Sequence, residues 1–104
     1  MGEETTFEQS YLEWLSEKVT PKKLSDFYLL YPDIETFCLK RGILKKQLFK
    51  VIDLGIIKKV VRTVEENKVF RIKYKKKLRA MSEAIRYYYQ FAREYSESIA
   101  QTQE

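Results

Sequence analysis

The C-terminal part of the chain constrains the fold most, because its pattern predicts one long amphipathic helix. Residues 78–99 contain neither glycine nor proline. Their apolar residues recur at alternating intervals of three and four, which places them on one face of a helix of roughly 30 Å. This stripe consists of Leu78, Met81, Ile85, Tyr88, Ala92, Tyr95 and Ile99, and it is widened by Ala84, Tyr87 and Phe91.

The length of the chain limits how this helix can be covered. With 104 residues the chain is large enough for one domain and too small for two independent cores. We expect the core in residues 7–75 and the long helix in residues 76–100. The stripe could pack on the chain's own first helices. Its three heptads exceed what a domain of this size can cover, which favours pairing with a second copy in a homodimer.

The composition excludes several classes of enzyme. The chain has no histidine, so imidazole acid–base catalysis, Ser-His or Cys-His nucleophiles and His-containing metal sites are excluded. The single cysteine, Cys38, cannot form an internal disulfide, and we expect it to be buried and unreactive. Three glycines are too few for a glycine-rich phosphate loop. We therefore expect a protein without catalytic activity and without a cofactor, metal or small-molecule ligand.

Three short helices are predicted before Gly42. Thr5 and Thr6 lie three residues before Glu8 and Gln9, the spacing of a capping box, which can start a helix over residues 7–18. Thr20 followed by Pro21 is a second start signal, for a helix that Pro32 stops. A third helix is expected over residues 33–41, with Gly42 at its C-terminal end.

The pattern then changes along residues 44–74. One apolar stripe of a predicted helix that ends at Gly55 consists of Leu44, Leu48, Val51, Ile52 and Leu54. Residues 56–64 and 69–74 are rich in β-branched and aromatic residues and flank a short polar segment, which predicts a β-hairpin. In this hairpin Glu65 and Glu66 belong to a solvated turn. The predicted fold class is therefore mainly α with a β-hairpin (α+β).

The charge of the chain is concentrated in the same region. Residues 40–79 hold fifteen basic and three acidic residues, a net charge of +12, whereas residues 1–39 have a net charge of −5. An excess of this size within a folded domain is typical of a surface that binds phosphates. A solvated surface that only keeps the protein soluble is the alternative.

The order of these elements resembles a winged helix-turn-helix domain with an added long C-terminal helix. The resemblance covers residues 33–75. It depends on Leu48, on the run Asp53-Leu54-Gly55-Ile56-Ile57-Lys58-Lys59, and on Val69-Phe70-Arg71-Ile72-Lys73-Tyr74. These segments are similar to the end of a recognition helix, the turn after it and the two strands of the wing.

The resemblance implies sequence-selective binding of double-stranded DNA by the recognition helix and the wing. The implied contacts on the helix are Lys45, Lys46, Gln47 and Lys50, and those on the wing are Lys58, Arg62, Lys68, Arg71, Lys73 and Lys75. Arg62 and Arg71 would lie opposite each other across the hairpin. Because arginine is the common reader of guanine, the wing would then read the bases more than the lysine-rich helix does.

The expected function is that of a transcriptional regulator, or of an accessory protein that marks a site on plasmid or phage DNA. Small accessory proteins of conjugative plasmids, which bind near the origin of transfer, are similar in build. Two alternatives are a module that docks an acidic protein partner and an RNA-binding protein. No apolar run approaches the ~18 residues that span a bilayer, and the N-terminus lacks the pattern of a signal peptide. We therefore expect a cytoplasmic protein that does not contact a membrane.

Overall fold

Helices make up all of the regular structure of the described residues. The computed structural model describes residues 6–102, apart from the side chains of residues 99–102. Its elements are α1 (Phe7–Ser16), α2 (Pro21–Tyr28), α3 (Tyr31–Lys40), the 3₁₀ turn η1 (Leu48–Lys50), α4 (Leu54–Glu66), α5 (Lys68–Lys73), the 3₁₀ turn η2 (Lys75–Lys77) and α6 (Leu78–Thr102).

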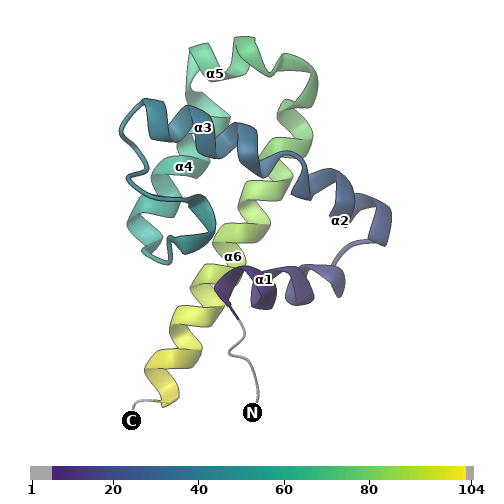
Figure 1. The fold of residues 1–104 in the computed structure, drawn as a ribbon, viewed down its shortest axis with the longest axis vertical. Helices are drawn as coiled ribbons and strands as arrows, with labels where there is room; N and C mark the ends of the chain where they lie inside the picture. Colours follow the sequence, from purple (N-terminus) through teal and green to yellow (C-terminus); the bar gives the residue numbers. More distant parts are fainter. Residues whose placement is uncertain (1–5, 103–104) are drawn as a thin grey trace.

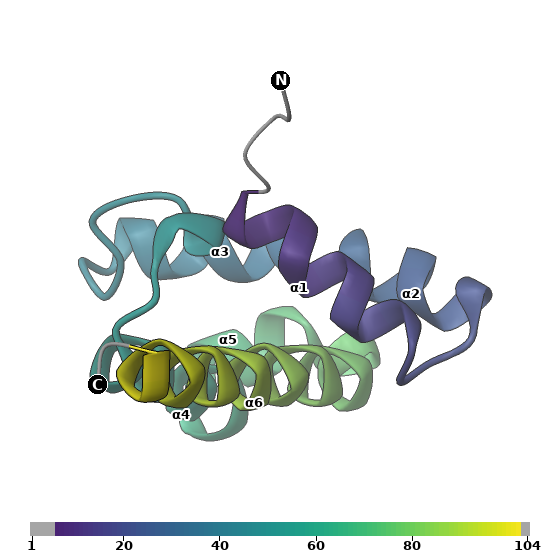
Figure 2. The same cartoon turned by 90° about the horizontal axis from the view of Figure 1, so that it is seen from below.

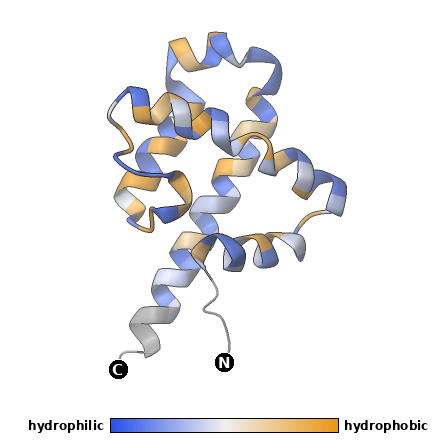
Figure 3. Cartoon of the chain, in the orientation of Figure 1, coloured by the Kyte–Doolittle hydropathy of each residue, from blue (hydrophilic) through white to orange (hydrophobic). Residues whose placement is uncertain are grey.

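The helices form two layers (Figures 1 and 2). Helices α1, α2 and α3 lie in the first layer, and α4, α5 and α6 lie in the second. Apolar and hydrophilic residues alternate along the helices (Figure 3), so each helix can turn an apolar face toward the space between the layers. Within the described residues, no helix combines the length and apolar character needed to cross a membrane.

The three predicted helices before Gly42 are present, but Pro32 does not stop the second one: α2 ends at Tyr28, and Pro32 lies in the first turn of α3, where its missing N–H costs no helical hydrogen bond. The Thr6 hydroxyl accepts a hydrogen bond from the Gln9 amide, and the Gln9 side chain accepts one from the Thr6 amide, as a capping box requires. The hydroxyl of Thr20 accepts from the Lys23 amide at the start of α2. Gly42 follows α3 with a φ of 74°, a backbone conformation that glycine adopts more easily than other residues.

The long C-terminal helix is also confirmed, and its apolar stripe packs within the chain. Met81, Ala84, Ile85, Tyr88 and Ala92 are fully buried. Phe7 of α1 packs its ring against those of Tyr88, Phe91 and Tyr95, and Trp14 packs against Tyr87 and Phe91. The chain's own helices therefore cover the stripe through Ala92, while Ile99 lies outside the described side chains. The homodimer stays a prediction.

The β-hairpin prediction is wrong, because both predicted strands are helices. Residues 54–66 form α4 and residues 68–73 form α5, and the described residues contain no strand. The chain therefore has no wing, and Arg62 and Arg71 do not face each other across a hairpin. The fold of the described residues is all-α.

Helix caps and burial explain why this segment is helical. The Asp53 side chain accepts from the Ile56 amide and starts α4, and the Asn67 side chain accepts from the Phe70 amide and starts α5. Ile57, Val60 and Val64 are fully buried at helical spacing. Burial of this face outweighs the preference of β-branched residues for strands, which is a weak and context-dependent preference.

The predicted helix over residues 44–54 is also wrong. This segment contains only the single turn η1, and Gly55 lies in the first turn of α4 rather than at the end of a helix. Leu44, Leu48 and Val51 are buried as the stripe predicts, whereas Ile52 is exposed. Several of their backbone polar groups bond outside the segment: the Leu48 amide donates to the Glu35 carboxylate, and the Leu48 and Val51 carbonyls accept from the Tyr88 hydroxyl. Within the segment, the Val51 amide donates to the Leu48 carbonyl.

A group of buried tyrosines joins the two layers. The Tyr88 hydroxyl of α6 lies 2.7 Å from the Leu48 carbonyl oxygen and 2.9 Å from that of Val51. The Tyr31 hydroxyl donates to the Ala84 carbonyl at 2.9 Å, and the Tyr11 hydroxyl bonds to that of Tyr31. Burial raises the pKa of all three tyrosine hydroxyls above its ordinary value, so they stay protonated donors.

We expect Tyr88→Phe to lower the free energy of unfolding by about 1–3 kcal/mol, because the buried Val51 carbonyl loses its donor, whereas the Leu48 carbonyl still accepts from the Val51 amide. Urea denaturation followed by circular dichroism measures the change. Tyr89→Phe is the matched control, since the adjacent ring is only half-buried and its hydroxyl makes no hydrogen bond to the described residues. The control should change stability by less than about 0.5 kcal/mol. Equal losses in the two variants would contradict the role given to the Tyr88 hydroxyl.

Candidate nucleic-acid interface

An open groove of about 690 Å³ runs between α4 and α6. Its basic residues are Lys58 and Arg62 of α4 and Arg86 and Arg93 of α6. Val61, Tyr89 and Gln90 supply apolar and neutral polar surface, and Glu65 and Glu66 supply the acidic groups. Hence four cations from two helices converge on one groove.

Helical spacing places these residues on the outer side of the second layer. Lys58 and Arg62 are one turn apart on α4, and Arg86 and Arg93 are two turns apart on α6. On α6 the two arginines lie roughly opposite Ala84 and Tyr88, which face the first layer. The same helix therefore presents an apolar face to the core and a basic face to the groove.

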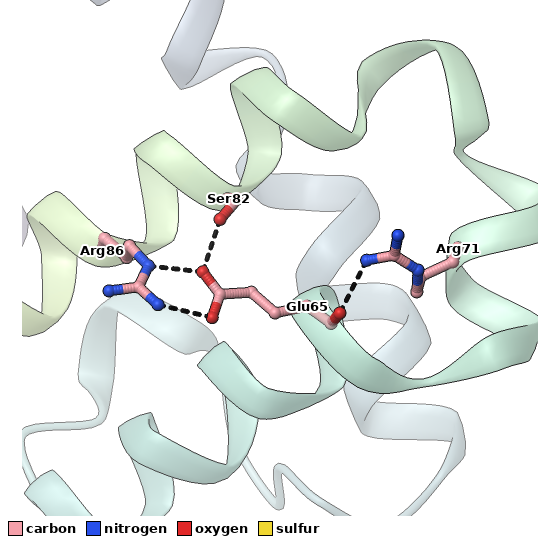
Figure 4. A network of polar contacts seen from close by, with 4 residues as sticks. All are labelled: Glu65, Arg71, Ser82 and Arg86. Atoms are coloured by element: carbon pink, nitrogen blue, oxygen red, sulfur yellow. Dashed lines mark hydrogen bonds and ion pairs between the residues drawn. The ribbon is translucent and has the colours of Figure 1, made fainter.

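One of the four cations is held in a fixed position (Figure 4). The Arg86 guanidinium donates to both carboxylate oxygens of Glu65, from Nε and, at 2.7 Å, from Nη2. The Ser82 hydroxyl donates to the same carboxylate at 2.5 Å. Figure 4 shows the remaining guanidinium nitrogen of Arg86 pointing away from Glu65. Arginine has five N–H donors, so Arg86 keeps donors for a second anion.

This network shifts the protonation equilibria of both partners. The hydrogen bond from Arg86 holds the pKa of the Glu65 carboxyl below its ordinary value, and the same bond raises the pKa of Arg86. Both groups therefore stay charged near neutral pH. Since the Arg86 side chain is 66% exposed, the pair contributes little to stability and acts mainly by orienting the guanidinium.

The other three cations of the groove have no partner within the described residues. Lys58, Arg62 and Arg93 are exposed, and no hydrogen bond or ion pair in that part of the chain engages them. Like charges this close repel one another, and an anion bound between them would relieve the repulsion.

The ten residues predicted as DNA contacts are all exposed, but they do not form one surface element. Lys58 and Arg62 line the groove, whereas Lys45, Lys46 and Lys50 lie on the connection between α3 and α4. Lys68, Arg71 and Lys73 belong to α5, and Lys75 begins η2. Gln47 lines a separate hollow beside Glu8 and Glu35, where two carboxylates disfavour a phosphate.

Arg71 lies beside a second hollow that adjoins the groove. This hollow has a volume of about 500 Å³, and its basic residues are Arg71, Arg79 and Arg86. The Arg71 guanidinium donates to the backbone carbonyl of Glu65 at 2.7 Å. Arg86 lines both the groove and this hollow, so the basic surface is continuous from α5 to the middle of α6.

The arginines of α6 are functional candidates that sequence reasoning missed. Arg79, Arg86 and Arg93 recur every seven residues and therefore lie on one face of α6. The net negative charge of residues 80–104 conceals this stripe, because four glutamates are counted with two arginines. The seven-residue interval is the signal that could have found them.

Neither a protein-family model, nor a curated protein, nor a solved structure matches this chain. The resemblance to winged helix-turn-helix proteins is thus not tested by relatives. Within the described residues there is no cluster of three or more potential metal ligands, and burial raises the pKa of the Cys38 thiol to about 12. The basic groove is the site with the clearest chemical preference.

The Arg86–Glu65 contact predicts a specific pH dependence of stability. A carboxyl whose pKa is lower in the folded state stabilises the fold above its unfolded pKa of about 4.3, and this contribution is lost as the pH falls through the folded value. The difference in unfolding free energy between wild type and Glu65→Gln should therefore shrink from pH 7 to about pH 3. Urea denaturation at each pH measures this difference.

Glu66→Gln is the control for this measurement. Glu66 is the next residue on α4, is exposed and forms no ion pair with a basic residue of the described chain. The difference in unfolding free energy between Glu66→Gln and the wild type should stay nearly constant over the same pH range. A constant difference for Glu65→Gln as well would show that the contact with Arg86 does not stabilise the fold.

Proposed function

We propose that the chain is a non-enzymatic protein that binds double-stranded DNA, with the phosphate backbone held in the groove between α4 and α6. The observation that supports this proposal is the convergence of Lys58, Arg62, Arg86 and Arg93 on one open groove. Three of these cations are uncommitted, and the fourth is oriented by Glu65. The functional class is a DNA-binding regulator or an accessory protein at a DNA site.

The residue types suit a phosphate backbone. Each guanidinium can donate two parallel hydrogen bonds to phosphate oxygens, and the lysine ammonium acts as a point charge. Neutralising several phosphates releases condensed counterions from DNA, which supplies most of the binding free energy at low salt. An open groove of this kind admits a backbone rather than a small ligand.

Duplex DNA fits the groove better than a single strand. Single-strand binding relies on exposed aromatic rings on which successive bases stack. Tyr89 is the aromatic residue that lines this groove, and it is half-buried. Trp14 packs instead against Tyr87 and Phe91 in the core. The surface thus offers charge and hydrogen bonds more than stacking platforms.

We expect the affinity for a duplex to fall steeply with salt. If the four cations each neutralise one phosphate, log K should fall against log salt with a slope of roughly −3.6. Arg62→Ala and Arg93→Ala should each make the slope shallower by about 0.9. Fluorescence anisotropy with a labelled duplex over a series of salt concentrations measures both quantities.

Lys22→Ala is the matched control. Lys22 is an exposed cation on α2 in the first layer, and its replacement removes one positive charge, as Arg62→Ala and Arg93→Ala do. It should leave the slope unchanged. Equal effects of Lys22→Ala and Arg62→Ala would mean that net charge, and not the groove, binds DNA. Stronger binding of a structured RNA, or no binding to any nucleic acid, would favour the alternatives of RNA binding or of an acidic protein partner.

A further inference from the structure

The hollow beside Glu8 and Glu35, of about 240 Å³, has the opposite chemistry to the groove. It lies where α1, α2, α3 and η1 meet, and its polar residues are Glu8, Glu35 and Gln47. Tyr28 and Phe49 supply aromatic walls. No basic residue lines it, although the chain as a whole has a net charge of +5.

The two carboxylates of this hollow lack a cationic partner. Glu8 accepts a hydrogen bond from the Tyr28 hydroxyl at 3.1 Å, and Glu35 accepts one from the Leu48 amide at 2.7 Å. Neither forms an ion pair with a basic residue of the described chain. Both are only partly exposed. Two half-buried carboxylates without a counter-ion, lining one hollow, favour the entry of a cation.

The aromatic walls specify what kind of cation fits. The Tyr28 and Phe49 rings are nearly parallel, with an interplanar angle of 20° and centroids 6.3 Å apart. A planar guanidinium stacks on such ring faces and donates hydrogen bonds to carboxylates in its own plane. An ammonium donates hydrogen bonds to carboxylates but does not stack on a ring in this way. Tyr28 is 43% exposed, so its ring can be reached from solvent.

We propose that this hollow binds the guanidinium group of an arginine side chain presented by a partner protein. Charge complementarity supports such a partner, because two carboxylates and no basic residue line the hollow, which would attract a cationic side chain. A second copy of this chain fits less well. Inserting an arginine of its groove into the hollow of another copy is a head-to-tail contact, which forms open chains unless the rotation closes.

The hollow and the groove occupy different layers and share no residue. The inference is therefore independent of DNA binding. The protein would then join a nucleic acid on its second layer to a basic protein segment on its first.

A titration with N-acetyl-arginine amide, followed by ¹H–¹⁵N NMR, tests the proposal on the intact chain. The Leu48 amide is a reporter inside the site, because it donates directly to Glu35. We expect saturable shifts of this amide with a dissociation constant of about 1–10 mM. N-acetyl-citrulline amide, which has the same shape without the charge, should bind roughly tenfold more weakly. Equal binding of the two compounds, or no saturable shift, would overturn the proposal.

Variants locate the binding in the hollow. Glu8→Gln and Glu35→Gln each remove one negative charge. The glutamine side-chain oxygen can still accept the hydrogen bond from the Tyr28 hydroxyl or the Leu48 amide, so the fold should be retained. Each should weaken arginine binding roughly tenfold. Glu13→Gln removes a negative charge from α1, the helix that carries Glu8, at a position outside the hollow. It should leave arginine binding unchanged. An equal effect of Glu13→Gln would overturn the assignment.

Sedimentation of the wild-type chain distinguishes the source of the arginine. A chain that is monomeric at tens of micromolar, while binding the arginine amide, supports a partner of a different sequence. Concentration-dependent self-association that Glu8→Gln abolishes would overturn that part of the proposal and identify a second copy as the occupant.

Discussion

The side chain of Tyr88 is the contact on which the two-layer arrangement depends. Its hydroxyl bonds to two carbonyls of the connection between α3 and α4, and its ring packs against Phe7 and Tyr11 of α1. One residue of α6 therefore fixes both the first helix and a segment with little regular structure. A buried tyrosine can do this because its ring contributes apolar area while its hydroxyl donates to backbone carbonyls, of which that of Val51 has no backbone donor among the described residues.

The position of α6 determines the functional surface. Because its apolar face is occupied by the core through Ala92, the arginines at seven-residue intervals must face away from it. Helix α4 packs along α6 through Ile57, Val60 and Val64, which turns Lys58 and Arg62 toward the same outer side. The groove is thus a consequence of packing two amphipathic helices, and only the Arg86–Glu65–Ser82 network is an additional polar feature.

Local signals predicted the parts of the fold that depend on local chemistry. The caps at Thr6 and Thr20, the turn at Gly42 and the long apolar stripe of α6 were sufficient for four helices. They were insufficient for residues 44–74, where a run of β-branched residues also satisfies helical spacing at Ile57, Val60 and Val64. Choosing between the two patterns requires knowing that α6 covers this face. Lys58 and Arg62 were found because they lie in the basic segment, whereas Arg86 and Arg93 belong to a segment of net negative charge.

The distribution of ion pairs explains why the groove keeps its excess charge. Lys23 with Glu83 and Lys77 with Asp33 each join the first layer to the second, and both pairs are exposed. Such pairs contribute little to stability, so the tyrosine core must hold the layers together against the repulsion within residues 40–79. Among the carboxylates of the first layer, Asp33 pairs with Lys77, while Glu8 and Glu35 line the acidic hollow, and none of the three lines the groove between α4 and α6. Glu65 and Glu66 are the acidic residues that line the groove, beside its four cations. A bound polyanion would supply the negative charge that these two residues do not.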